Sequence, residues 1–106
     1  KVIMSKPTGY TWDNSIVIIH NHPNNSGFSH VEIDTYIKMP QIHGAIVVTG
    51  NGKIYSVSSI DRDKPIERSF EMFYNIYKET YGLHRASDMV LKDLHRKGWL
   101  IYEKYE

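Results

Sequence analysis

The sequence predicts an α+β fold, in which a small mixed sheet is flanked by helices, and three observations support this class. The run "SIVIIH" (15–20) is short, apolar and rich in β-branched residues, which is typical of a buried strand. The run "GAIVVTGNGKIYSVSS" (44–59) contains two extended segments around an Asn-Gly turn, a strong signal of a β-hairpin. Apolar and aromatic residues then recur at helical spacing from residue 66 to residue 81.

The first helix is predicted from its boundary signals. Residues 1–14 are expected to be loop, because they are rich in Pro, Gly, Asp and Asn. The segment "NHPNNSGF" (21–28) is loop by composition as well. The next residues, "SHVE" (29–32), form a capping box, so a helix begins at Ser29 and ends before Pro40.

The second half of the chain is predicted to be mostly helical. Gly82 ends the helix that starts near residue 66, and Ser87 is expected to cap a third helix that ends at Gly98. The final run "WLIYEKY" (99–105) favours a strand. Phe70, Phe73, Tyr74, Tyr77 and Tyr81 share one stripe of the long helix, which predicts a core face, with a partner-binding face as the alternative.

Composition limits the classes of function. A chain of 106 residues with 41% hydrophobic content is expected to form a single domain, residues 1–106. The net charge of +1 does not favour nucleic acid as a partner, and the absence of cysteine excludes thiolate metal sites. No apolar run approaches a membrane span and no signal peptide is visible, so we expect no membrane partner and favour the cytoplasm over secretion.

The string "HNHP" (20–23) directly after the predicted strand indicates a metal site. In an extended segment residues i and i+2 point to the same side, so the imidazoles of His20 and His22 can face one point. Zinc is often held by histidine nitrogens and a carboxylate, with one position left open for water. The other histidines, which lack a partner at ligand spacing and are expected to be structural or exposed, are His30, His43, His84 and His95.

The third ligand is expected from the first turn of the following helix. Glu32 lies there and Asp34 is two residues further on; the two point in roughly opposite directions, about 200° apart, so at most one of them faces the histidines. Glu32 also belongs to the capping box with Ser29, and we expect capping and metal binding to compete for this one carboxylate. The choice between Glu32 and Asp34 stays open at this point.

The pattern "HNHP…S-x-x-E" resembles the His-x-His-Pro…Ser-x-x-Asp signature of JAMM/MPN metalloproteases, which include deubiquitinating isopeptidases and RadC-type bacterial proteins. The likeness covers about residues 15–59, and "HNHP" is most similar to the RadC-type branch, found in bacteria and phage. It implies a JAMM/cytidine-deaminase-like core at 15–59 with a helical part at 66–106. It leaves open that the chain is a piece of a larger domain.

The resemblance implies a zinc-dependent peptidase or isopeptidase that uses a metal-bound water on a protein or peptide substrate. His20, His22 and Glu32 would bind Zn²⁺, and Ser29 would stabilise the reacting oxygen. The chain departs from the family pattern in having glutamate in place of aspartate, a loop one residue shorter, and no glutamate before Glu32. The family's general base is then absent, or lies before Lys1, or is replaced by Asp13.

Two alternative functions remain. Without the base, the chain would be a catalytically inactive JAMM-like scaffold that binds protein partners. A metal-independent, toxin-type ribonuclease, with His20 or His22 as the general base, belongs to another class, and the near-neutral charge argues against it.

Overall fold

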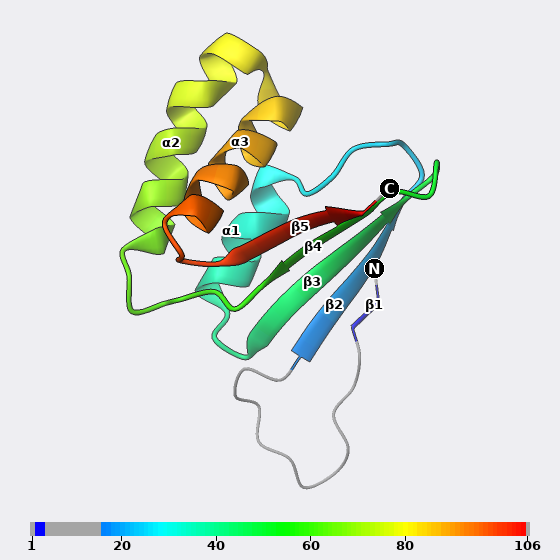
Figure 1. The fold of residues 1–106 in the computed structure, drawn as a ribbon, viewed down its shortest axis with the longest axis horizontal. Helices are drawn as coiled ribbons and strands as arrows, with labels where there is room; N and C mark the ends of the chain where they lie inside the picture. Colours follow the sequence, from blue (N-terminus) through cyan, green and yellow to red (C-terminus); the bar gives the residue numbers. More distant parts are fainter. Residues whose placement is uncertain (1, 4–15, 106) are drawn as a thin grey trace, which may run out of the picture.

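The computed structural model describes residues 2–3 and 16–105, and it has the predicted α+β class. The strands form one mixed sheet in the order β1-β2-β3-β4-β5, in which only β2 and β3 are parallel (Figure 1). The strands are β1 (Val2–Ile3), β2 (Ile16–His22), β3 (Ile42–Thr49), β4 (Ile54–Ser58) and β5 (Ile101–Tyr105).

The first helix connects the two parallel strands. It is α1 (His30–Lys38), which begins after Ser29 as predicted and ends before Pro40. The parallel register places His20 beside Val47 and His22 beside Thr49, so β3 supports the strand that carries both histidines. The short strand β1 pairs with β2 on its other side, whereas the sequence predicted loop for residues 1–14.

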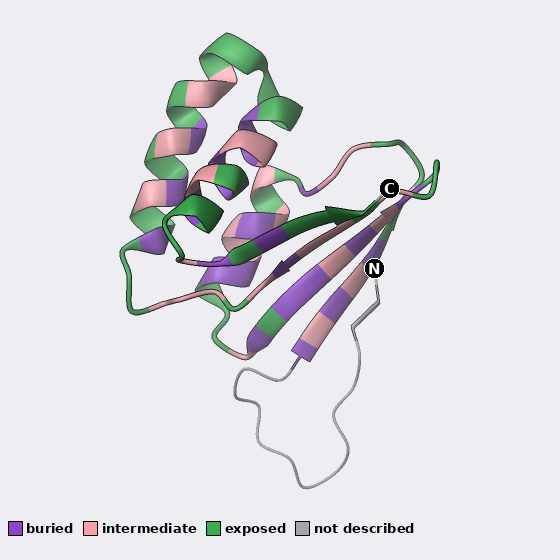
Figure 2. Ribbon diagram, viewed as in Figure 1, coloured by how far each residue is buried: buried purple, intermediate pink, exposed green. Residues whose placement is uncertain are grey.

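The helices cover one face of the sheet. Buried and less buried residues alternate along β2 and β3, which is the pattern of strands that present one face to a core (Figure 2). That face packs against the apolar sides of all three helices in a single cluster. The helical residues of this core are Ile33, Tyr36, Ile37, Ile66, Phe70, Tyr74, Ala86, Val90, Leu91 and Leu94.

The second and third helices form a hairpin with a one-residue turn. Helix α2 (Ile66–Tyr81) ends at Gly82 as predicted, but α3 (Leu83–Arg96) begins directly after it. The prediction that Ser87 caps α3 is therefore wrong: Ser87 lies one turn inside the helix and is 1% exposed. Gly82 reverses the chain with a φ of +84°, a conformation that glycine adopts without steric cost. None of the helices in the described residues has the length and apolarity needed to cross a bilayer.

One arginine fixes the carboxyl end of α1. The Arg62 guanidinium donates hydrogen bonds to the backbone carbonyls of Tyr36, Ile37, Met39 and Ile42, at 2.6–3.1 Å. The last carbonyls of a helix have no partner within the helix, and a cation there also interacts favourably with the helix dipole. Arg62 therefore holds α1 against the start of β3, and this contact orients the helix whose first turn carries Glu32.

Candidate metal centre

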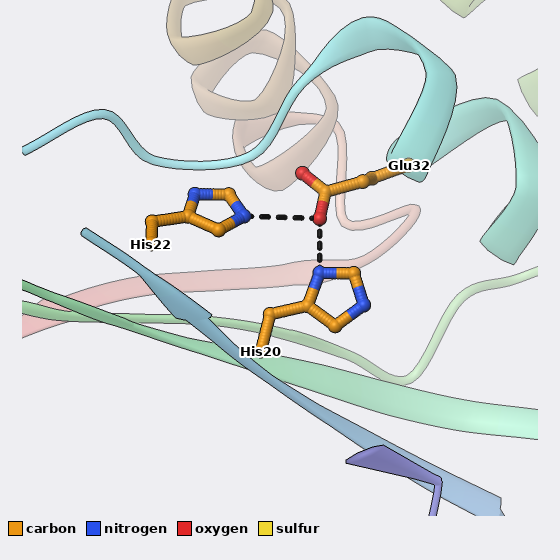
Figure 3. A group of neighbouring side chains, drawn as sticks. All are labelled: His20, His22 and Glu32. Atoms are coloured by element: carbon orange, nitrogen blue, oxygen red, sulfur yellow. Dashed lines mark hydrogen bonds and ion pairs between the residues drawn. The ribbon is translucent and has the colours of Figure 1, made fainter. Parts of the chain in front are cut away.

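Three predicted ligands meet at the carboxyl end of β2. His20 and His22 extend from the same side of the strand, and Glu32 reaches them from the first turn of α1 (Figure 3). One ligand atom from each residue lies within 4.8 Å of the other two. Donor atoms that share a zinc ion at about 2 Å are roughly 3–4 Å apart, so the cluster has the dimensions of a site for a single ion.

Glu32 uses its two carboxylate oxygens for different tasks. Oε1 accepts the backbone N–H of Ser29 at 2.8 Å, and the Ser29 hydroxyl accepts the N–H of Glu32 at 3.2 Å, which completes the capping box. Oε2 faces Nδ1 of His20 and Nε2 of His22, the latter at 3.1 Å. The expected competition between capping and metal binding is therefore wrong, because the cap fixes the carboxylate with its second oxygen toward the histidines.

The Glu32 carboxylate is anionic at neutral pH. Burial alone would raise its pKa, but the Ser29 N–H, the hydrogen bond with His22 and the charges of His22 and His20 together bring it below the ordinary value. An ionised oxygen is the form that binds a cation. The side chains of His20, His22 and Glu32 are 10%, 18% and 16% exposed, so the centre is largely desolvated and still reached by solvent.

The His22 ring is oriented by the loop that follows it. Its Nδ1–H donates to the carbonyl of Ser26 at 3.0 Å, since a carbonyl can only accept. In the neutral ring this leaves Nε2 without a proton, and Nε2 points at Oε2 of Glu32. Two acceptors repel each other unless a proton or a metal cation lies between them. A second ring nitrogen bound to a backbone carbonyl is also the usual arrangement around a metal-bound histidine.

The other predicted residues are separate from this cluster or lie at its edge. Asp34 pairs with Lys38 at 2.9 Å on the surface of α1, which leaves Glu32 as the carboxylate that faces the histidines. Ser29 is the exposed N-cap of α1. Asp13 lies outside the described residues.

His30 is a structural residue, which is one of the two roles expected for it. Its ring stacks on Tyr74, with centroids 4.1 Å apart, and lies 3.6 Å from Glu71, so it is half-buried between α1 and α2 rather than an exposed residue. It sits one position after the cap, where the side chain faces α2. The sequence signal for this contact was the aromatic stripe of α2, which needed a neighbour on α1 to cover it.

Sequence reasoning missed the contact that holds the loop between His22 and Ser29. The Asn25 side chain accepts the backbone N–H of Asn51, at the tip of the β3–β4 hairpin, at 3.1 Å. A Cβ at Gly50 would lie 2.4 Å from the Pro23 carbonyl oxygen, so only glycine permits this close approach. The "TGNG" turn was read as a hairpin signal alone, and nothing local shows that its tip meets residues 23–25.

The arrangement defines a class of site. Two imidazoles and one carboxylate leave coordination positions open, and this donor set suits zinc and other divalent transition metals. The comparisons of this chain with protein-family models, with curated proteins and with solved structures find no match. The chemistry open to the chain therefore follows from the geometry of His20, His22 and Glu32.

Proposed function

We propose that the chain binds one Zn²⁺ ion through His20, His22 and Glu32. The single observation that carries this proposal is the convergence of Nδ1 of His20 and Nε2 of His22 on Oε2 of Glu32, with the His22 nitrogen at 3.1 Å. In a neutral His22 ring whose proton lies on Nδ1, Nε2 and Oε2 are both acceptors, and a cation between them removes their repulsion. The Ser26 carbonyl binds Nδ1 of His22, and the Ser29 N–H binds Oε1 of Glu32. The His22 ring and the Glu32 carboxylate are therefore oriented before an ion binds.

We further propose a JAMM-like hydrolase that cuts a peptide or isopeptide bond. The order of β2, a serine-capped helix and the parallel strand β3 supports it, since the motif residues of the resemblance all lie in this unit. The chemistry that zinc supplies in such a site is polarisation of a carbonyl and activation of a water molecule near neutral pH.

Within this proposal Ser29 stabilises the developing oxyanion. Its hydroxyl oxygen already accepts the N–H of Glu32, and its O–H proton remains available to a substrate. Ser29 is exposed and begins the helix that carries Glu32, so a bound carbonyl near the ligands is within reach of the helix start. The positive end of the α1 dipole favours negative charge at the same place.

A catalytically inactive scaffold is the second candidate. The 106 residues contain no glutamate before Glu32, and the family's general base is a glutamate on an earlier strand. Such a scaffold would bind zinc in the same way and recognise protein partners without cleaving them.

Metal analysis of protein purified without chelator tests the first step. We expect one equivalent of zinc per chain, and we expect His22→Ala to lose most of it. The matched control is His43→Ala, which removes an exposed histidine of β3 that is not part of the cluster. Iron and manganese should be measured in the same samples. Protein free of any metal, or equal metal in the His22 and His43 variants, would contradict the proposal.

Cleavage assays on peptide and ubiquitin-like isopeptide linkages test the second step. For the zinc-loaded protein we expect Ser29→Ala to lower kcat by about 10²-fold, as for other oxyanion donors, and Ser29→Thr to retain most activity because it keeps the hydroxyl and the cap. Zinc-loaded wild type that cleaves neither linkage would favour the scaffold. RNA cleavage that survives EDTA would favour a metal-independent nuclease instead.

A further inference from the structure

Two buried polar atoms beside the metal centre have no hydrogen-bond partner among the described residues. One is Nε2 of His20, on the ring whose Nδ1 faces Glu32, and the other is the hydroxyl of Tyr36. The two residues are 8% and 1% exposed. A buried polar group without a partner costs free energy, so two such groups on neighbouring rings require an explanation.

The two side chains are neighbours. The rings of His20 and Tyr36 lie edge to face, with centroids 6.4 Å apart. No hydrogen bond joins Nε2 to the hydroxyl in the structure, so a small ring movement or one bridging water is needed to connect them. In Figure 3, Nε2 of His20 points away from both His22 and Glu32. Tyr36 is four residues after Glu32, so it lies one turn further along the same face of α1.

Metal binding by His20 would give Nε2 of His20 and the Tyr36 hydroxyl a reason to hydrogen-bond to each other. A histidine that binds a metal through one ring nitrogen carries its proton on the other, and that N–H almost always donates to an oxygen. For His22 this oxygen is the Ser26 carbonyl. Nε2 of His20 has no hydrogen-bond partner among the described residues, and the Tyr36 hydroxyl is a buried oxygen without a partner on the neighbouring ring.

We propose that Tyr36 is a positioning residue of the metal centre, whose hydroxyl oxygen accepts the Nε2–H of His20 and so directs Nδ1 toward the ion. This inference rests on the proposed zinc site. Tyr36 is neutral in this role, because burial and the charge of Glu32 both raise its pKa above the ordinary value. It orients a ligand and is not itself a ligand, and Arg62 holds the carbonyl of the same residue.

The test is Tyr36→Phe, which removes the hydroxyl and keeps the ring. We expect the Kd for zinc, measured by competition with a chelating dye, to rise about 10-fold or more. The urea midpoint of the metal-free variant should stay equal to that of the wild type or rise, because the variant loses a buried hydroxyl that had no partner. A merely structural tyrosine would give the reverse, a lower midpoint with an unchanged Kd.

Tyr102→Phe is the matched control. Tyr102 is also buried, but its hydroxyl donates to Asp88 at 2.6 Å, and neither residue belongs to the His20–His22–Glu32 cluster. We expect this variant to have a lower urea midpoint and a zinc Kd within twofold of the wild type. A Kd within twofold for Tyr36→Phe as well would overturn the role of Tyr36 and leave the zinc site standing. Wild type that binds no zinc would overturn both proposals.

A measurement on the wild type covers the case in which Tyr36→Phe does not fold. In zinc-loaded protein, the ¹⁵N NMR shifts of the His20 ring should show Nδ1 bound to metal and Nε2 protonated. The same spectrum should show the opposite assignment for His22, with Nε2 on the metal and Nδ1–H on Ser26. Metal bound through Nε2 of His20 would refute the inference.

Discussion

Helix α1 and the hairpin of α2 and α3 cover the same sheet face, but the β2–α1 segment and the hairpin differ in what they bury. Around the carboxyl end of β2 the interior contains two imidazoles, a carboxylate and a phenol without a partner. The helical hairpin buries apolar side chains, among them Phe70, Val90 and Leu94, each 0% exposed. Its charged groups form ion pairs nearer the surface, such as Lys92 with Asp88 at 3.2 Å.

This difference indicates that one region stabilises the fold and that the other holds the candidate site. Burying apolar surface favours folding whatever ions are present, whereas buried polar groups cost free energy unless each is paired. The hairpin therefore stabilises the fold, and the β2–α1 segment holds polar groups whose pairing a cation would complete. We expect substitutions in the hairpin to change stability without changing metal affinity, and substitutions around the site to do the reverse.

The largest expected effect is that of Phe70→Ala. Phe70 is fully buried at the centre of the core, and removing a buried phenylalanine ring costs about 4 kcal/mol. Urea denaturation should show this loss equally with excess zinc and with chelator. Met72→Ala, on the same helix and 50% exposed, is the control and should change the free energy of unfolding by less than about 0.5 kcal/mol. A loss that zinc abolishes would mean that the two regions are not independent.

The next prediction concerns the hairpin tip that supports the loop after His22. Gly50→Ala places a Cβ against the Pro23 carbonyl, so the loop or the tip must move, and we expect the zinc Kd to rise about 10-fold, equivalent to roughly 1.4 kcal/mol. Gly52→Ala is a close control: it strains a φ of +86°, but its Cβ meets nothing within 4 Å. Both variants should lose about 1 kcal/mol of stability. Equal zinc affinity in the two variants would show that the tip does not position His22.

The elements that local sequence determines were predictable. Strand β2, the capped start of α1, the β3–β4 hairpin and the end of α2 each follow from turn residues, caps or periodicity within a few positions. The approach of His20, His22 and Glu32 was predictable for the same reason, because all three lie within 13 residues on one strand, one loop and one helical turn. The prediction that Ser87 caps α3 was wrong because Gly82 alone makes the turn and the helix has already begun at Leu83.

The supports of the site were not predictable because they are distant in sequence. Arg62 binds carbonyls that precede it by 20–26 residues, and the backbone N–H of Asn51 binds an asparagine 26 residues earlier. Nothing local in the sequence marks Tyr36, and only the structure shows that its buried hydroxyl has no partner and that its ring adjoins His20. Periodicity assigns a residue to a face but does not identify the polar atom it meets there.

The smallest expected effect is that of Asp88→Asn, which removes a charge from the helical hairpin. Burial would raise the pKa of Asp88 in α3, but hydrogen bonds from Lys104, Tyr102 and Lys92 outweigh it and bring the pKa below the ordinary value. Because the folded-state pKa is the lower one, this carboxylate contributes stability above the ordinary pKa and loses that contribution as the pH falls through the folded-state value. Asp88→Asn should therefore cost about 1 kcal/mol at pH 7 and progressively less below about pH 4.

Urea denaturation of metal-free protein at pH 7 and below about pH 4 measures this difference. The control is Asp63→Asn, on the exposed turn before α2, which should change the free energy of unfolding by less than about 0.5 kcal/mol. Zinc should leave the Asp88 effect unchanged, because its cations, Lys104 and Lys92, belong to the chain. In the β2–α1 segment the proposed site would take its cation, zinc, from outside the chain. An Asp88 effect that depends on zinc would remove that distinction.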